Sequence, residues 1–221
     1  MRKKGLLPAI GLAFTLAVTG CGTTVDSGAP HNEKIISDPA KAKTEKTTVK
    51  ADGTVDLLDQ FVAGKREAGY YDSDYKFKIT DLKLDQDEWD AYSVGARRDL
   101  DNDGEEELIM NGPYGGMYLD GQDGRVMVLA KGDGTAGQMT YVKYENAIWI
   151  VHSDTSHTGR KFYNFKKYKG ANNIIDEFDL KAEYYDKKDD AYDKTSRFTY
   201  RGQKITMEKF EQLRSEILGI E

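Results

Sequence analysis

The sequence predicts an α+β fold, in which a mainly antiparallel β meander of about eight strands is flanked by an N-terminal and a C-terminal helix. Three observations predict it. Between residues 77 and 200, short segments alternate apolar and polar residues with a period of two, which is typical of half-buried strands. Turn residues, above all Gly and Asp, separate these segments. At both ends of this region the apolar residues have helical spacing instead.

The expected strands follow one another with turn residues between them, which is the antiparallel pattern. They are Phe77–Ile79, Leu108–Met110, Met117–Leu119, Val126–Ala130, Met139–Tyr144, Ile148–His152, Phe162–Tyr168, Ile174–Tyr184 and Phe198–Tyr200. Gly121-Gln122-Asp123-Gly124 and Gly132-Asp133-Gly134 are two of the expected turns.

Each expected helix has its own start signal. Within residues 54–67, Thr54 is a candidate cap and Asp56 lies in the first turn. The last helix is expected to begin at the N-cap Thr206 and to stop at Gly219. Apolar residues share one face of each helix: Leu57, Leu58, Phe61 and Val62 in the first, and Phe210, Leu213, Ile217 and Leu218 in the last.

Composition and charge indicate one soluble domain, expected over residues 53–219, and a monomer. The formal net charge is -6. Residues 1–20 carry three positive charges and no acid, so the chain without them has a charge of -9. This balance argues against nucleic acid as a partner, because nucleic acid requires a basic face. It equally argues against electrostatic adsorption to anionic lipids.

The first residues have the parts of an export signal. Arg2, Lys3 and Lys4 precede an apolar run of about fourteen residues, which is too short to span a bilayer as a helix. Small residues then precede Cys21, the only cysteine. Residues 1–20 are therefore expected to be a signal peptide. Residues 21–52, which are polar, are expected to form a flexible tether.

Val18-Thr19-Gly20-Cys21 resembles the lipobox of bacterial lipoproteins. This resemblance implies that the thiol of Cys21 carries a lipid, and that the protein is anchored to the membrane and faces outside the cytoplasm. Val18 departs from the leucine that is commonest at its position. The alternative is an ordinary secretory signal, but an exported chain would then carry one thiol without a disulfide partner.

An acidic loop is the strongest candidate site. Aspartates at positions 1, 3 and 5 of a tight turn, Asp99, Asp101 and Asp103, converge on one point, and Gly104 permits the turn. Oxygen ligands in this pattern favour a hard divalent cation such as Ca²⁺. The alternative is a solvated acidic turn without a metal. A structural metal is expected here rather than a regulatory switch, because the chain has no disulfide.

The spacing DxDxDGxxE followed by a strand resembles the calcium loop of FG-GAP repeats. That resemblance implies ligands at Asp99, Asp101, Asp103, the Glu105 carbonyl and Glu107. FG-GAP loops usually have Asp at the last of these positions. The chain also resembles uncharacterised exported lipoproteins of Firmicutes, which share a short helix, an Asp-rich loop and a stretch such as Gly112–Gly116. This second resemblance implies no activity.

A second candidate ligand site contains two of the three histidines. His152, Asp154, His157 and Arg160 lie between two expected strands, and Tyr114 is expected near them. One interpretation is a cell-surface hydrolase in which these side chains act as acid–base groups or ligands and the arginine holds an anion. A hydrogen-bonded hairpin loop is the favoured interpretation of this segment. The favoured hypothesis is a non-enzymatic domain that binds a protein, peptide or glycan partner.

Overall fold

The computed structural model describes residues 56–156, 160–170, 172–183 and 191–220, all of which belong to one compact unit of the chain. Within these residues it has an α+β fold with twelve strands in two six-stranded sheets and two α-helices. The predicted fold class is confirmed, but the predicted count of about eight strands is too low. The expected signal peptide, the tether and Cys21 lie outside the described residues.

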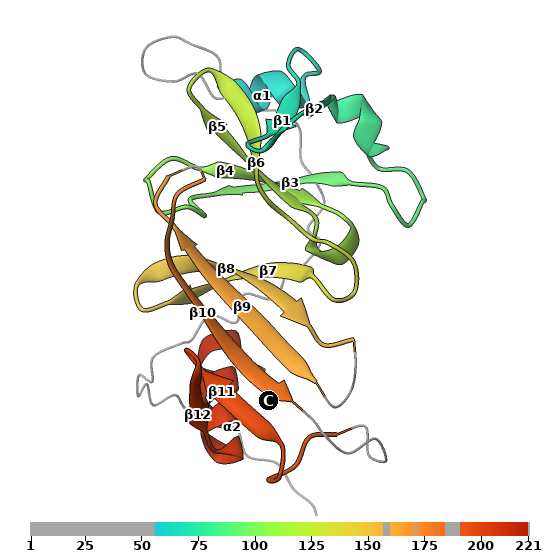
Figure 1. Ribbon diagram of the computed structural model, residues 1–221. Helices are drawn as coiled ribbons and strands as arrows, with labels where there is room; N and C mark the ends of the chain where they lie inside the picture. Colours follow the sequence, from blue (N-terminus) through green and yellow to red (C-terminus); the bar gives the residue numbers. More distant parts are fainter. Residues whose placement is uncertain (1–55, 157–159, 171, 184–190, 221) are drawn as a thin grey trace, which may run out of the picture. The chain divides into compact units, whose positions relative to one another are not determined.

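The first sheet has the strand order β2-β1-β6-β5-β4-β3 (Figure 1). Its strands are β1 (Ala68–Tyr70), β2 (Ser73–Phe77), β3 (Ser93–Arg98), β4 (Glu107–Asn111), β5 (Met117–Gln122) and β6 (Arg125–Lys131). Neighbouring strands are antiparallel except β1 and β6, which are parallel. The β1–β2 hairpin therefore adds to the far side of β6, and the first sheet is not the simple meander that the sequence predicts.

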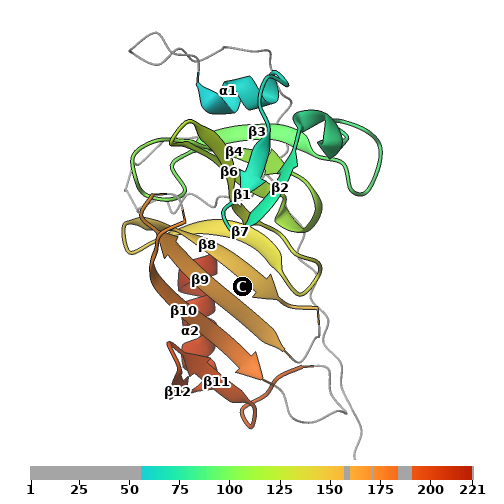
Figure 2. The same cartoon turned by 45° about the horizontal axis from the view of Figure 1, so that its top comes forward.

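Helix α1 (Leu57–Val62) packs on the first sheet through Leu58 and Phe61 (Figure 2). It begins at the N-cap Asp56, whose Oδ1 accepts hydrogen bonds from the backbone N–H groups of Leu58 at 2.8 Å and Asp59 at 3.1 Å. These bonds satisfy two of the unpaired donors at a helix start. The helix ends earlier than the expected residue 67, and its N-cap is Asp56, which was expected in the first turn; the expected cap Thr54 lies outside the described residues.

The second sheet is an uninterrupted antiparallel meander in the order β12-β11-β10-β9-β8-β7. Its strands are β7 (Gln138–Tyr144), β8 (Ala147–Asp154), β9 (Lys161–Tyr168), β10 (Ile174–Glu183), β11 (Arg197–Tyr200) and β12 (Gln203–Ile205). Helix α2 (Met207–Leu218) packs on one face of this sheet (Figure 2). As predicted, Thr206 caps its start and Gly219 ends it, with a φ of 63°.

The buried apolar residues form three clusters. One lies between α1 and the first sheet, and a second lies between the second sheet and α2. The third contains residues of both sheets: Ile109, Tyr118, Leu129 and Ala130 from the first sheet, Met139, Ile150 and Tyr168 from the second, and Leu100 from a loop. The sheets therefore share a core, and the acidic loop between β3 and β4 contributes Leu100 to it.

Two short 3-10 helices complete the described elements. They are η1 (Ile79–Leu82), which follows β2, and η2 (Pro113–Gly115), which connects β4 to β5. Tyr114 lies in η2 with a φ of 56°. Gly115 has a positive φ, and a Cβ there would lie 1.9 Å from the carbonyl oxygen of Met139, so this tight turn requires glycine.

Candidate metal centre

The loop that joins β3 to β4 folds around its own acidic side chains. Asp101 Oδ1 accepts a hydrogen bond from the backbone N–H of Asp103 at 3.1 Å, and Asp103 Oδ1 accepts one from Glu105 at 2.7 Å. Asn102 and Gly104 have φ values of 63° and 97°, in the left-handed region that Asn and Gly tolerate best. The local sequence thus forms a tight turn that is held by its own carboxylates.

Three of the five predicted ligands converge in this loop. One carboxylate oxygen each of Asp99, Asp101 and Glu107 lies within 4.8 Å of the others. Oxygens that bind one Ca²⁺ at about 2.3–2.6 Å are at most about 5 Å apart. The three side chains therefore have the spacing of a cation site, and the triad can hold a metal ion.

The triad is largely withdrawn from water. Asp101 is 0% exposed and Glu107 1% exposed. Asp99 is half-buried, and its Oδ1 atom accepts no hydrogen bond from any residue that the structure describes. A buried carboxylate oxygen without such a bond is costly unless a proton or a cation compensates it. The missing hydrogen bond at Asp99 Oδ1 within the described residues is independent of the acidic sequence pattern, and it fits a bound cation.

Glu107 is fixed by the other end of the loop. Its Oε2 accepts hydrogen bonds from the backbone N–H groups of Leu100 and Asp101, the latter at 3.1 Å. The pKa of Glu107 is raised to about 8, mainly by burial and also by the charges of Asp101 and Asp120, while the two backbone hydrogen bonds lower it in part. Without a cation, the buried carboxyl therefore retains a proton near neutral pH, and a cation would take that proton's place.

Asp120, on β5, is a site residue that the sequence analysis missed. It is only 5% exposed, and its Oδ2 accepts a hydrogen bond from the Tyr71 hydroxyl at 3.3 Å. Burial raises the pKa of Asp120, and the charges of Asp103 and Glu105 raise it further. Asp120 therefore adds a fourth buried carboxyl beside the acidic loop. A single acidic residue inside the apolar strand Met117–Gln122 is the signal that could have indicated it.

Of the other two predicted ligands, the Asp103 carboxylate has a different position, whereas the ligand predicted at Glu105 is its backbone carbonyl and stays a prediction. Asp103 and Glu105 are exposed and line a hollow of about 390 Å³ together with Asp120 and Gln122. Their carboxylates are not members of the converging triad. The acidic region therefore has an inner, buried part made by Asp99, Asp101 and Glu107 and an outer part open to solvent.

The second predicted site is only partly assembled in the structure. Asp154 and Arg160 form an ion pair, and the guanidinium of Arg160 also lies over the Phe162 ring, 4.9 Å from its centroid. Burial lowers the pKa of His152, and the nearby charge of Lys166 lowers it further. His157 lies outside the described residues. No recorded hydrogen bond, ion pair or ring contact within the described ranges joins Tyr114 to the rest of this group.

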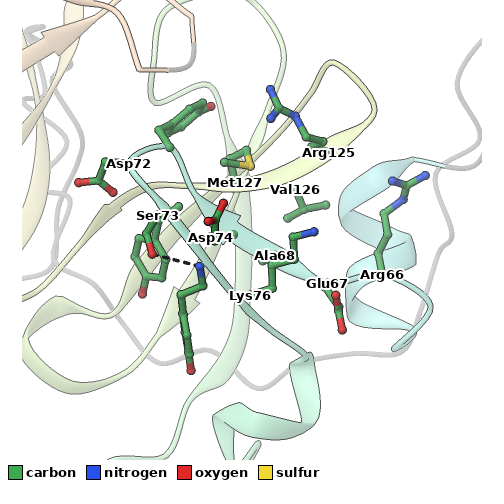
Figure 3. A pocket seen from close by; sticks show the side chains of 14 residues that line it. Arg66, Glu67, Ala68, Asp72, Ser73, Asp74, Lys76, Arg125, Val126 and Met127 are labelled. Atoms are coloured by element: carbon green, nitrogen blue, oxygen red, sulfur yellow. Dashed lines mark hydrogen bonds between the residues drawn. The ribbon is translucent and has the colours of Figure 1, made fainter.

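A larger hollow, of about 750 Å³, lies along the β1–β2 hairpin and the start of β6 (Figure 3). Asp72, Asp74, Lys76 and Arg125 are among the side chains that line it. This hollow was not predicted from the sequence. Its acidic and basic side chains are mixed, so its charge favours neither an anion nor a cation.

Neither α-helix in the described part of the chain combines the length and the apolar character that crossing a membrane requires. Comparisons of the chain with protein-family models, with curated proteins and with solved structures found no match.

Proposed function

We propose that this protein is a lipoprotein on the outer face of a bacterial membrane, whose folded domain is stabilised by one structural Ca²⁺ and binds a protein, peptide or glycan partner. The observation that carries the proposal is the convergence of Asp99, Asp101 and Glu107 within 4.8 Å, with Asp101 and Glu107 buried. Bringing three carboxylates together away from water is unfavourable unless a positive charge joins them.

The chemistry of the donors favours calcium among common metal ions. All three converging groups are carboxylates, and no cysteine or histidine belongs to this cluster. Zinc sites in proteins are usually built from Cys and His, whereas Ca²⁺ takes carboxylate and carbonyl oxygens. Mg²⁺ demands a near-octahedral arrangement and retains several waters, which fits a buried triad poorly. The ion would supply charge neutralisation and hold the loop, and no reaction step is assigned to it.

Anchoring is supported by the sequence alone. The stretch Val18–Cys21 resembles a lipobox, and the mature chain has no other cysteine. Two or more acyl chains give stable attachment, since each buried CH₂ contributes about 0.8 kcal/mol. A domain outside the cytoplasm without disulfides gains from a metal that constrains its fold.

A binding role is favoured over hydrolysis by the state of the second candidate site. Asp154 accepts hydrogen bonds from Ser156 and is ion-paired with Arg160. The Asp154 carboxylate therefore stabilises the loop in which it lies, in agreement with the interpretation of this segment as a hydrogen-bonded hairpin loop. Among the described residues of this site, the geometry therefore favours a loop-holding role for Asp154 over an acid–base role.

The metal site can be tested by titrating CaCl₂ into the full chain, purified in a non-ionic detergent, and measuring heat. We expect one binding site, which the double variant Asp99→Asn/Asp101→Asn abolishes. The variant Asp72→Asn/Asp74→Asn removes the same charge from exposed positions of the same sheet and should bind as the wild type does. Equal calcium binding by wild type and by Asp99→Asn/Asp101→Asn would exclude the site.

The anchor has a separate test. When cells that express the wild type or Cys21→Ser are fractionated, the wild type should sediment with membranes. The Cys21→Ser protein should lose its lipid, and metabolic labelling with a fatty acid should detect the difference. Equal labelling of the two proteins would contradict lipidation at Cys21.

A further inference from the structure

Asn102, at the tip of the acidic loop, is bound to the second sheet. Its side-chain Oδ1 accepts a hydrogen bond from the backbone N–H of Ile148 at 2.8 Å. Its Nδ2 donates to the carbonyl oxygens of Ile148 at 3.0 Å and Tyr168 at 3.1 Å. Both amide N–H groups and the amide oxygen are therefore used, and all three partners belong to β8 and β9.

These contacts extend the β8–β9 ladder. The recorded pairs of β8 and β9 run from Asp154↔Phe162 to Ile150↔Lys166. Continued by two residues, the same register would place Ile148 opposite Tyr168. The side-chain amide of Asn102 hydrogen-bonds to the backbone of both residues. It therefore replaces a direct backbone hydrogen bond between β8 and β9 at the end of the strands that lies beside the acidic loop. A side-chain amide can do this because it carries the same donor and acceptor groups as a peptide.

The residues on either side of Asn102 strengthen the connection. The Leu100 side chain lies in the apolar cluster that both sheets share. The carbonyl oxygen of Asp101 accepts a hydrogen bond from Gly170 N–H at 3.2 Å, and that of Asn102 accepts one from Lys169 Nζ at 2.9 Å. Three consecutive residues thus link the acidic triad to the second sheet: Leu100 and Asn102 bind the sheet, and Asp101 belongs to the triad.

We propose that cation binding to the acidic loop controls how firmly the two sheets are joined, and that Asn102 is the residue that connects them. The inference rests on the proposed calcium site. When the triad lacks a cation, repulsion between the Asp99 and Asp101 carboxylates loosens the loop. The backbone that carries Asp101 also carries the Asn102 amide. When a cation is bound, the loop is fixed and the Asn102 amide holds β8 and β9 in place.

The test compares Asn102→Gly with a matched control. Glycine tolerates the φ of 63° at this position, so the change removes the three side-chain hydrogen bonds and leaves the turn possible. Asn146→Gly is the control. Asn146 is also in the left-handed region, with a φ of 60°, and lies exposed in the β7–β8 turn two residues before Ile148.

Calcium binding is measured first, by calorimetry on the full chain in non-ionic detergent, and amide hydrogen exchange is then followed with and without CaCl₂. In the wild type and in Asn146→Gly, we expect Ca²⁺ to slow exchange about tenfold or more in peptides covering residues 147–154, as well as in the acidic loop. In Asn102→Gly, Ca²⁺ should still bind and protect the acidic loop. It should slow amide exchange in residues 147–154 by less than about twofold.

Each result decides the inference. Calcium-dependent protection of residues 147–154 that persists in Asn102→Gly would overturn the role of Asn102. Calcium binding that protects only the acidic loop of the wild type would overturn the coupling and leave the proposed metal site intact. Absence of calcium binding to the wild type would overturn both.

Discussion

The Glu107 carboxylate accepts a hydrogen bond from the backbone N–H of Leu100, so the first residue of β4 holds the opposite end of the acidic loop. The same oxygen also accepts from Asp101 N–H. Glu107 thereby combines two roles. It closes the loop, and after Asp101 it is the most buried carboxyl of the triad. The two roles can be separated by changing its charge and keeping its shape.

Replacing Glu107 by Gln should weaken calcium binding without unfolding the loop. The Gln carbonyl oxygen can still accept the two backbone hydrogen bonds, but the negative charge is lost. We expect at least a tenfold loss of calcium affinity, about 1.4 kcal/mol, by calorimetry. Glu106→Gln removes the same charge from the exposed neighbouring residue and should change affinity less than about threefold. Equal losses in both variants would indicate a general charge effect instead of a ligand.

Without a cation, the protein should become less stable as pH rises from about 4.5 to about 8. Burial raises the pKa of Glu107 from its ordinary value of 4.5 to about 8. Over this range the folded state retains a proton that the unfolded chain has lost, so the free energy of unfolding falls with increasing pH. Denaturant unfolding in the presence of chelator, repeated across this range, measures the slope.

The same proton should make calcium binding depend on pH. Because the cation replaces the proton on Glu107, calcium affinity should increase as pH rises towards about 8. The Glu107→Gln variant should lose most of this dependence and most of the stability slope. A wild-type stability that increases with pH in chelator would contradict the assignment of a protonated Glu107.

The start of α1 should depend on its capping aspartate. Asp56 accepts two backbone hydrogen bonds, and Arg97 Nη2 lies 3.1 Å from Asp56 Oδ1 and 2.6 Å from Asp59 Oδ1. Asp56→Ala should lower the free energy of unfolding by about 1–2 kcal/mol. Asp56→Asn keeps a capping oxygen and should cost less, since Asp59 still pairs with Arg97. Equal costs in the two variants would show that the charge, and not the cap, is what matters.

The core of the second sheet should be sensitive to truncation at Phe165. This side chain is fully buried, and its ring stacks on Phe178 with centroids 4.5 Å apart. Phe165→Ala should destabilise the protein by about 3–5 kcal/mol, measured by denaturant unfolding. Trp89 is 79% exposed, so Trp89→Ala should change stability by less than about 0.5 kcal/mol. A similar, small effect of both would contradict the described packing.

Most strands could be predicted because they are short apolar segments bounded by turn residues: strands such as β10 alternate and bury one face, and β4, β5 and β6 are buried on both faces. Strands β1, β3 and β12 were not predicted, because they lack that pattern. The expected strand Phe77–Ile79 is wrong except at Phe77, the last residue of β2, since Ile79 begins η1. Strands β1 and β12 have three residues each, too few to show a period. Strand β3 (Ser-Val-Gly-Ala-Arg-Arg) lies at the sheet edge and has no fully buried residue. The strand order of the first sheet depends on β1 pairing with β6, a contact between distant residues that local periodicity does not encode.

The acidic loop was predictable as a unit, but its inward-facing members were not. From their spacing, Asp99, Asp101 and Asp103 are equally good candidate ligands. In the fold, the first two converge with Glu107, and the third is exposed. The part played by Asn102 depends on where β8 and β9 lie, which the loop sequence does not contain. Asp120 likewise joins the region only because β5 lies beside β4.

The most direct test of the account is thermal unfolding of the full chain in detergent, with millimolar CaCl₂ and with chelator. A ligand at 100 times its Kd stabilises the folded state by about 2.7 kcal/mol, which corresponds to a rise in Tm of roughly 5–10 °C for a domain of this size. We expect such a rise in the wild type and none in Asp99→Asn/Asp101→Asn. Identical melting of the wild type in calcium and in chelator would contradict the calcium site.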